Sequence, residues 1–214
     1  MLFRSNNITV YVVSAICGNF WQESGIDPGV WENLQAGNWT DLLKGYGLGQ
    51  WTNTGGDTHG RLYKLHEWLS QNGYADDDFD GQLAYIEYEN VWYRRAEAYQ
   101  FQNLQDFLTS QSTDLTMLTH AWNMGWEGIH DSSWNTRVTN AYNVCDFIQN
   151  NYDPTTYTPW YWTGNRYLSN QERYANAMYM FHVWNGGTPA PTPPTPPSIK
   201  KGMPLMMYLP RIIY

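Results

Sequence analysis

Charged side chains are scarce in this sequence, and basic ones are the scarcest. Only 15% of the 214 residues are charged, against a usual share of about 25%. The chain has 12 Lys and Arg residues but 20 Asp and Glu residues, which gives a net charge of −8 at pH 7. Nucleic-acid binding needs clustered cations that neutralise phosphates. The body of the chain has no such cluster, so we expect no nucleic-acid partner.

Cysteine is nearly absent as well, which excludes a disulfide framework. Cys17 and Cys145 allow at most one bridge, and Cys17 lies in an apolar run that suits a small buried side chain. A nucleophilic cysteine needs exposure and a group that stabilises its thiolate, so a cysteine peptidase is disfavoured. Asp57, His59 and His66 have no further ligands at a suitable spacing. We therefore expect no metal and no cofactor.

Long apolar segments are missing too. The run at residues 8–17 is far shorter than the ~20 residues that cross a membrane. No small-residue cleavage site follows it, so we interpret it as a core helix and not as a secretory signal. The segment 199–214 is apolar and basic, and Pro204 and Pro210 interrupt it. Contact with a membrane surface, docking on a partner and a disordered tail all stay open for this segment.

Aromatic residues are abundant instead. The chain has 12 Trp and 17 Tyr residues, and aromatic side chains make up 17% of it. Trp and Tyr combine a flat apolar face with a polar edge, so they suit the amphipathic faces of sugar rings. They also fill a core in place of Leu. The composition by itself leaves both roles open.

The pattern of apolar residues is mainly helical. No strand pair is convincing, although a short β-hairpin within residues 34–52 is an alternative to a plain loop there. We predict one domain of ordinary size over residues 1–187, a Thr/Pro linker of extended polyproline over 188–198, and the tail 199–214. A loop-rich segment, residues 22–58, separates the first helix from the others. The predicted helices span residues 8–21, 59–73, 78–101 (one long helix or two with a break near Val91), 112–125, 132–152 and 168–187.

One acidic residue, Glu23, follows Phe20 and Trp21 at the end of the first predicted helix. Glycosidic hydrolysis needs a carboxylic acid that stays protonated near neutral pH, and an apolar setting without a nearby cation favours that neutral form. The alternative is an exposed Glu at a helix end. The loop GYGLGQWTN (45–53) supports the catalytic interpretation. Its glycines allow close approach of the backbone to a ligand, Gln50 can donate and accept, and Tyr46 and Trp51 carry rings that stack on sugars.

An ES pair at a helix end followed by a Gly-x-Gln loop is similar to goose-type lysozymes and soluble lytic transglycosylases. Residues 12–145 more closely resemble the phage tail lysozyme family. The resemblance rests on ICGNFWQESGIDPGVWENL (16–34), GYGLGQWTN (45–53) and a late Glu…Arg…Ala stretch within WNMGWEGIHDSSWNTRVTNA (122–141). Asp27 stands where the family usually has Asn.

The resemblance implies a helical, lysozyme-like domain with a loop-rich cleft. Such a domain cuts the β-1,4 bond between N-acetylmuramic acid and N-acetylglucosamine in peptidoglycan. The resemblance makes Glu23 the catalytic acid and makes Tyr46, Gly47, Gln50 and Trp51 the wall of the sugar cleft. It also implies a place at the tail tip of a phage virion, beside other tail proteins, where the enzyme opens the host wall for DNA entry.

The second carboxylate of a hydrolase is less clearly marked. An inverting glycosidase needs a base and a retaining one needs a nucleophile. Glu32, Asp41 and Asp57 all lie in the loop-rich segment, and we favour Glu32 because the turn at PGVWEN can aim it toward Glu23. A lytic transglycosylase of the same fold would need no second acid. A non-catalytic wall-binding module would use the aromatic residues without Glu23.

The stretch YLSNQERYANAMYMFHVWNG (167–186) resembles the helix that leads into the Gly-Asn segment in this family. We therefore hypothesise a circularly rearranged domain in which this helix packs against residues 8–20. The alternative is an ordinary terminal helix.

Overall fold

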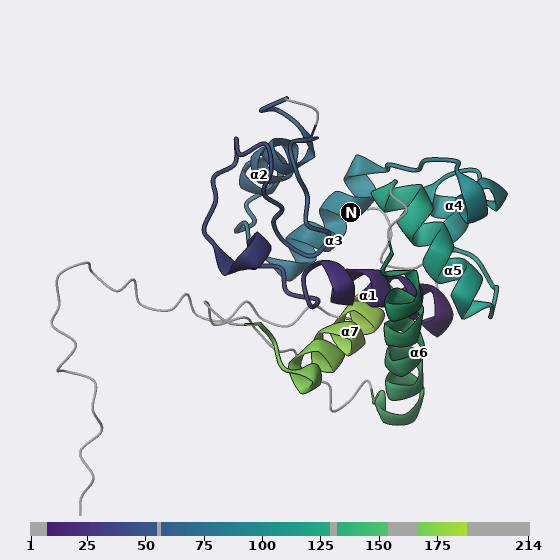
Figure 1. The fold of residues 1–214 in the computed structure, drawn as a ribbon. Helices are drawn as coiled ribbons and strands as arrows, with labels where there is room; N and C mark the ends of the chain where they lie inside the picture. The colour runs from purple at the N-terminus through teal and green to yellow at the C-terminus, as the bar shows by residue number, and fades with distance from the viewer. Residues whose placement is uncertain (1–7, 55–56, 129–131, 154–166, 188–214) are drawn as a thin grey trace, which may run out of the picture.

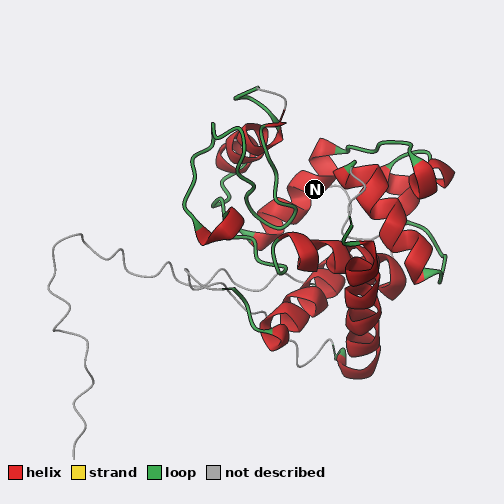
Figure 2. Ribbon diagram, viewed as in Figure 1, coloured by secondary structure: helices red, strands yellow, loops and turns green. Residues whose placement is uncertain are grey.

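The computed structural model describes residues 8–54, 57–128, 132–153 and 167–187. These residues form a mainly helical domain, which confirms the predicted fold class (Figures 1 and 2). None of the described helices is long and apolar enough to cross a membrane. The α-helices are α1 (Val10–Glu23), α2 (Arg61–Gln71), α3 (Phe79–Glu89), α4 (Leu104–Leu108), α5 (Leu115–Trp122), α6 (Trp134–Asn151) and α7 (Asn170–Trp184). Two 3-10 turns, η1 (Glu32–Leu34) and η3 (Ala96–Gln100), and a π-helical turn, η4 (Asn123–Glu127), complete them.

Helix α1 is the centre of the domain. It begins at Thr9, whose hydroxyl accepts a hydrogen bond from the Val12 amide, and its residues 12–20 are buried. Helices α5, α6 and α7 pack against it. In Figure 1, α6 and α7 lie below α1, and α2 and α3 lie above it. Gly18 makes the α1–α6 contact close, because a Cβ there would lie 2.6 Å from the Arg137 carbonyl oxygen. This contact brings the start of α6 to the end of α1.

The observed helices match the predicted ranges with local differences. The range 78–101 divides at Asn90, which is left-handed (φ 47°) and ends α3. Asp114 caps α5, which therefore begins later than the predicted range 112–125, and the short α4 was not predicted. Of the two alternatives for residues 34–52, the described chain shows a loop with isolated bridges, from Tyr46 to Trp31 and to Trp51. Individual backbone hydrogen bonds, such as the pair between Tyr46 and Trp51, hold this loop without a regular strand ladder.

Helix α7 lies directly against α1. The Met180 sulfur is 3.8 Å from the Cys17 sulfur, and the Asn185 amide donates to the Ile8 carbonyl oxygen at 3.1 Å. This is the packing that a circularly rearranged domain requires, and the rearrangement stays a hypothesis. Cys17 and Cys145 are buried and unbridged. Burial raises the pKa of the Cys17 thiol, which makes it a poor nucleophile.

The linker 188–198 and the tail 199–214 lie outside the described residues. The domain boundaries given above stay predictions.

Candidate functional site

Glu23 is the last residue of α1, and the chain turns sharply after it. Gly25 (φ 69°) and Ile26 (φ 58°) both have left-handed backbones, which is unusual for a β-branched residue such as Ile26. The buried amide of Asn176 in α7 donates to the Ile26 carbonyl oxygen at 2.8 Å. The guanidinium of Arg173, also in α7, lies 5.2 Å from the Trp21 ring. Helix α7 therefore holds the turn that presents Glu23.

The two sequence motifs are joined directly in space. The Ser24 hydroxyl, next to Glu23, donates to the Leu48 carbonyl oxygen at 2.8 Å. The Gly47 amide donates to the Val30 carbonyl oxygen at 2.9 Å. Gln82 of α3 is fully buried; its amide nitrogen donates to the Pro28 carbonyl and its oxygen accepts from the Leu48 amide. The Glu23 turn and the Gly-rich loop therefore form one hydrogen-bonded unit.

Two glycines of the loop are required by this packing. Gly47 has φ 73°, and a Cβ there would lie 2.5 Å from the Gln82 side chain. A Cβ on Gly49 would lie 2.3 Å from the Trp126 ring. These glycines let the loop backbone pack closely against other parts of the protein. The prediction from the sequence was that they let the backbone approach a ligand.

The residues predicted to line the sugar cleft are largely internal. Tyr46 and Trp51 are buried, so in this conformation neither ring offers a free face for stacking. Burial also raises the pKa of the Tyr46 phenol, so that it stays neutral. Gln50 is part-buried, and its amide nitrogen donates to the carbonyl oxygens of Val30 and Gly47. In this conformation both rings pack inside the loop, and their contact with a sugar stays a prediction.

A buried guanidinium, that of Arg137 in α6, contacts Glu23. One Nη of Arg137 donates to a Glu23 carboxylate oxygen, and the other donates to Glu127 at 3.1 Å and to Asn19 Oδ1 at 3.2 Å. The Arg137 side chain is 2% exposed, Glu127 is 5% exposed and Glu23 is 21% exposed. Of the three groups, Glu23 is therefore the one that solvent reaches.

The π-helical turn η4 places Glu127 in this network. In η4 the Gly128 amide bonds the Asn123 carbonyl oxygen, one residue wider than in an α-helix. The Asn123 side-chain amide then donates to the same Glu127 oxygen at 2.6 Å. The wider turn also carries Trp126 into the core, against Phe20, Trp51 and Trp122. Such turns are frequent at functional sites.

The setting of Glu23 differs from the predicted one. We expected an apolar surrounding without a cation, and the structure places the Arg137 guanidinium against the carboxylate. A carboxylate at the C-terminal end of a helix faces the negative end of the helix dipole. The cation from α6 offsets this unfavourable position.

Each of the three candidates for a second carboxylate accepts a hydrogen bond from a backbone amide in or directly after the loop-rich segment. Glu32 is exposed and accepts from the Gly45 amide at 3.2 Å. Asp41 accepts from the Asn38 amide, and Asp57 from the His59 amide. None of these contacts reaches Glu23. The carboxylate that shares a cation with Glu23 is Glu127.

Arg137, Glu127 and Asn123 are not among the site residues predicted from the sequence. The sequence could have identified them, because all three lie in the stretch 122–141, which is part of the family resemblance. The contact between Arg137 and Glu23 joins residues 114 positions apart in the chain. No group of three or more His, Cys, Asp or Glu side chains suited to a metal ion occurs among the described residues.

Comparison with known proteins identifies a family and a relative. The model of a family described as phage tail lysozyme matches residues 1–148. Morphogenesis protein 1 of Bacillus phage B103 is 42% identical over 79 residues, which cover 36% of this chain and 19% of that protein. The chain thus matches less than a fifth of that relative's length.

Proposed function

The chain belongs to the phage tail lysozyme family, and from this premise we propose that it is a glycoside hydrolase of the bacterial cell wall. Its substrate would be peptidoglycan, and its reaction the hydrolysis of the β-1,4 bond between N-acetylmuramic acid and N-acetylglucosamine. The observation that carries the proposal is Glu23, a partly exposed carboxyl at the end of a buried helix, joined through Ser24 to the Gly-rich loop.

In this mechanism Glu23 protonates the glycosidic oxygen of the leaving sugar. It must therefore carry a proton when the substrate is bound, although Arg137 contacts it in the free protein. Arg137 keeps a second carboxylate partner, Glu127, when Glu23 becomes neutral. A buried guanidinium without any anion would be strongly unfavourable. Glu127 thus allows Glu23 to exist in both protonation states without leaving the cation uncompensated.

Gln50, Gly47, Tyr46 and Trp51 would act chiefly by shaping the loop that faces Glu23. We retain Glu32 as the proposed second carboxylate, with Asp41 and Asp57 as alternatives. Glu32 is exposed and lies in the 3-10 turn η1. The Gly45 amide donates a hydrogen bond to the Glu32 carboxylate and so holds this turn.

A lytic transglycosylase is the second candidate. The specific observation in its favour is that Glu32, Asp41 and Asp57 each bond a backbone amide of a neighbouring loop residue. A transglycosylase needs only the one acid. Mass spectrometry of digested peptidoglycan separates the two reactions, because reducing N-acetylmuramic ends indicate hydrolysis and 1,6-anhydro ends indicate transglycosylation. Freed peptides would contradict both.

The phage origin of the family and of the matched relative supports a virion-associated protein. We propose that it acts at the tail tip, beside other tail proteins, and opens the wall locally during DNA entry.

The decisive test is Glu23→Gln. The amide keeps the shape of the side chain and cannot donate the proton, so lysis of purified cell walls should fall by about 100-fold or more. Binding to the walls should persist. If Glu23→Gln lyses walls as fast as the parent, the catalytic proposal is wrong and a wall-binding module becomes the better explanation.

A further inference from the structure

Two hollows flank helix α2 on the surface of the domain. One, of about 510 Å³, lies between α2 and the loop 38–40. The other, of about 560 Å³, lies between α2 and α3 and extends to Tyr93. Both volumes are typical of ligand sites, which span roughly 300–1,000 Å³. Glu67 and Gln71 line both hollows, so the two adjoin along the outer face of α2. Glu23 and Arg137 line neither of them.

The first hollow has a fixed aromatic wall. The Trp39 ring stacks on the His66 ring at 4.4 Å with an interplanar angle of 2°. His66 is held in turn, because its Nδ1 lies 2.7 Å from Asp76 Oδ1. Tyr63 and Ser70 from α2 line the same hollow with polar groups. The site therefore combines a rigid ring surface with hydroxyl groups.

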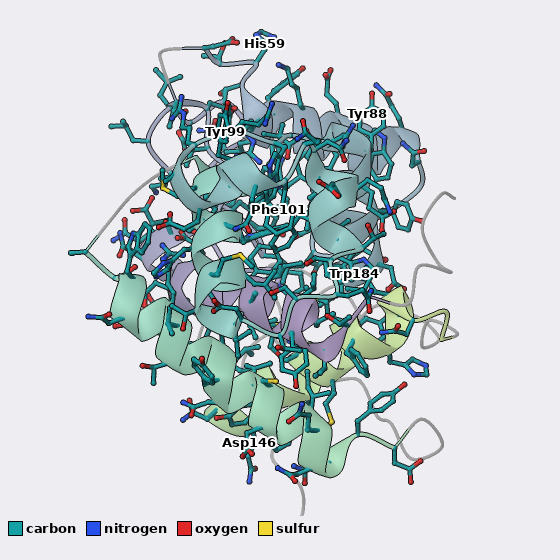
Figure 3. All side chains as sticks on the ribbon, turned by 90° about the vertical axis from the view of Figure 1, so that its right-hand side faces the viewer. His59, Tyr88, Tyr99, Phe101, Asp146 and Trp184 are labelled. Carbon is teal, nitrogen blue, oxygen red and sulfur yellow. The ribbon has the colours of Figure 1, made fainter. Side chains whose placement is uncertain are left out.

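The second hollow repeats this combination. Trp68 lies 5.3 Å from Tyr88 and 5.7 Å from Tyr85, measured between ring centroids. Tyr88 is 66% exposed and lies on the outside of the domain (Figure 3). Trp68 is half-buried and Tyr85 is buried, so Tyr88 is the ring of this group that solvent reaches most.

Among the residues that line the two hollows, the charges balance. Arg61 and Glu89 are paired at 2.6 Å, which leaves Lys64 and Glu67 as one cation and one anion. A groove without excess charge does not select a polyanion, which disfavours nucleic acid. Flat rings beside hydroxyl and amide groups suit a neutral amphipathic chain. A glycan of N-acetylated hexosamines has this chemistry.

We propose that the two hollows form a glycan-binding groove across α2, defined by Trp39, Tyr63, Ser70, Trp68 and Tyr88. It would hold a strand of β-1,4-linked N-acetylhexosamines apart from the residues around Glu23. The choice of ligand rests on the proposed function, since a wall hydrolase meets this polymer. The groove would keep the enzyme on the wall between cleavage events.

Titration calorimetry with N-acetylchitohexaose tests the groove on the full-length Glu23→Gln protein, which should not cut the probe. Tyr88→Ala removes one exposed ring, and Ser70→Trp places a large side chain in the first hollow. Each should weaken binding about five- to tenfold. Tyr142→Ala is the matched control, because Tyr142 is 52% exposed on α6 and should leave the affinity unchanged.

The inference is overturned if the parent Glu23→Gln protein does not bind the hexamer. It is also overturned if both groove variants bind as well as that parent, or if Tyr142→Ala loses as much affinity as they do. Wall lysis is measured separately. Retained lysis in Glu23→Gln would contradict the catalytic proposal alone, and unchanged binding in the groove variants would contradict the groove alone.

Discussion

Glu23 has two neighbours of opposite chemical character. On one side the Gly-rich loop is fastened by neutral hydrogen bonds from Ser24, Gln82 and backbone amides. On the other side α6 supplies one buried cation, Arg137, shared between two carboxylates. Removing one partner of a neutral hydrogen bond lowers stability moderately. Removing one partner of a buried ion pair lowers it strongly, because a buried charge is left uncompensated. The loop side therefore sets geometry, and the α6 side sets the charge balance of the site.

The largest loss of stability should follow from removing the buried cation, Arg137. Arg137→Met leaves Glu127 buried without its cation, so we expect the free energy of unfolding to fall by about 3–5 kcal/mol. Urea denaturation measures this. Arg94→Met, at an exposed position, is the control and should change little. Adding Glu127→Gln to Arg137→Met should recover part of the loss, because it removes the stranded charge. Stability equal to the parent's in Arg137→Met would show that the network does not hold the site together.

A smaller effect should come from the neutral side. Gln82→Leu keeps the size of the side chain but leaves the Leu48 amide and the Pro28 carbonyl without their buried partner. We expect a loss of about 2 kcal/mol in the free energy of unfolding. Gln149→Leu, on the exposed face of α6, should be close to neutral. If Gln82→Leu is as costly as Arg137→Met, the distinction between the two sides fails.

The smallest effect on stability is expected at Glu32. Its side chain is exposed, so Glu32→Gln should change the free energy of unfolding by no more than about 0.5 kcal/mol. If Glu32 activates water, hydrolysis should nevertheless fall by about 100-fold. Asp57→Asn, at a second exposed loop carboxylate, serves as the comparison in the same lysis assay. Full lysis by Glu32→Gln with 1,6-anhydro products would favour transglycosylation instead.

Much of the architecture follows from local sequence patterns. The apolar period predicts α1, α2, α6 and α7 to within a few residues, because the face that a helix buries repeats along a short stretch. Ser169 caps α7, and the Glu172 carboxylate accepts a reciprocal hydrogen bond from the Ser169 amide. Helix α4 was missed, since its five residues are too few for a period to show.

The aromatic residues show where local reasoning ends. Composition left their role open between core and sugar binding. The structure buries Trp51, Trp122, Trp126 and Trp184 in the core and leaves Tyr88 exposed beside Trp68. Which ring faces solvent depends on what packs over it, and a residue's own sequence neighbours do not carry that information.

The sequence by itself determined that Glu23 ends a buried helix and that a Gly-rich loop follows, because both features are local. Only the tertiary structure decided what surrounds the carboxylate. Helix α6 crosses α1 at Gly18, where a Cβ would collide with the Arg137 carbonyl, and this close crossing sets the Arg137 guanidinium against Glu23. Charges act through space, so a partner 114 residues away along the chain becomes a neighbour only when the helices pack.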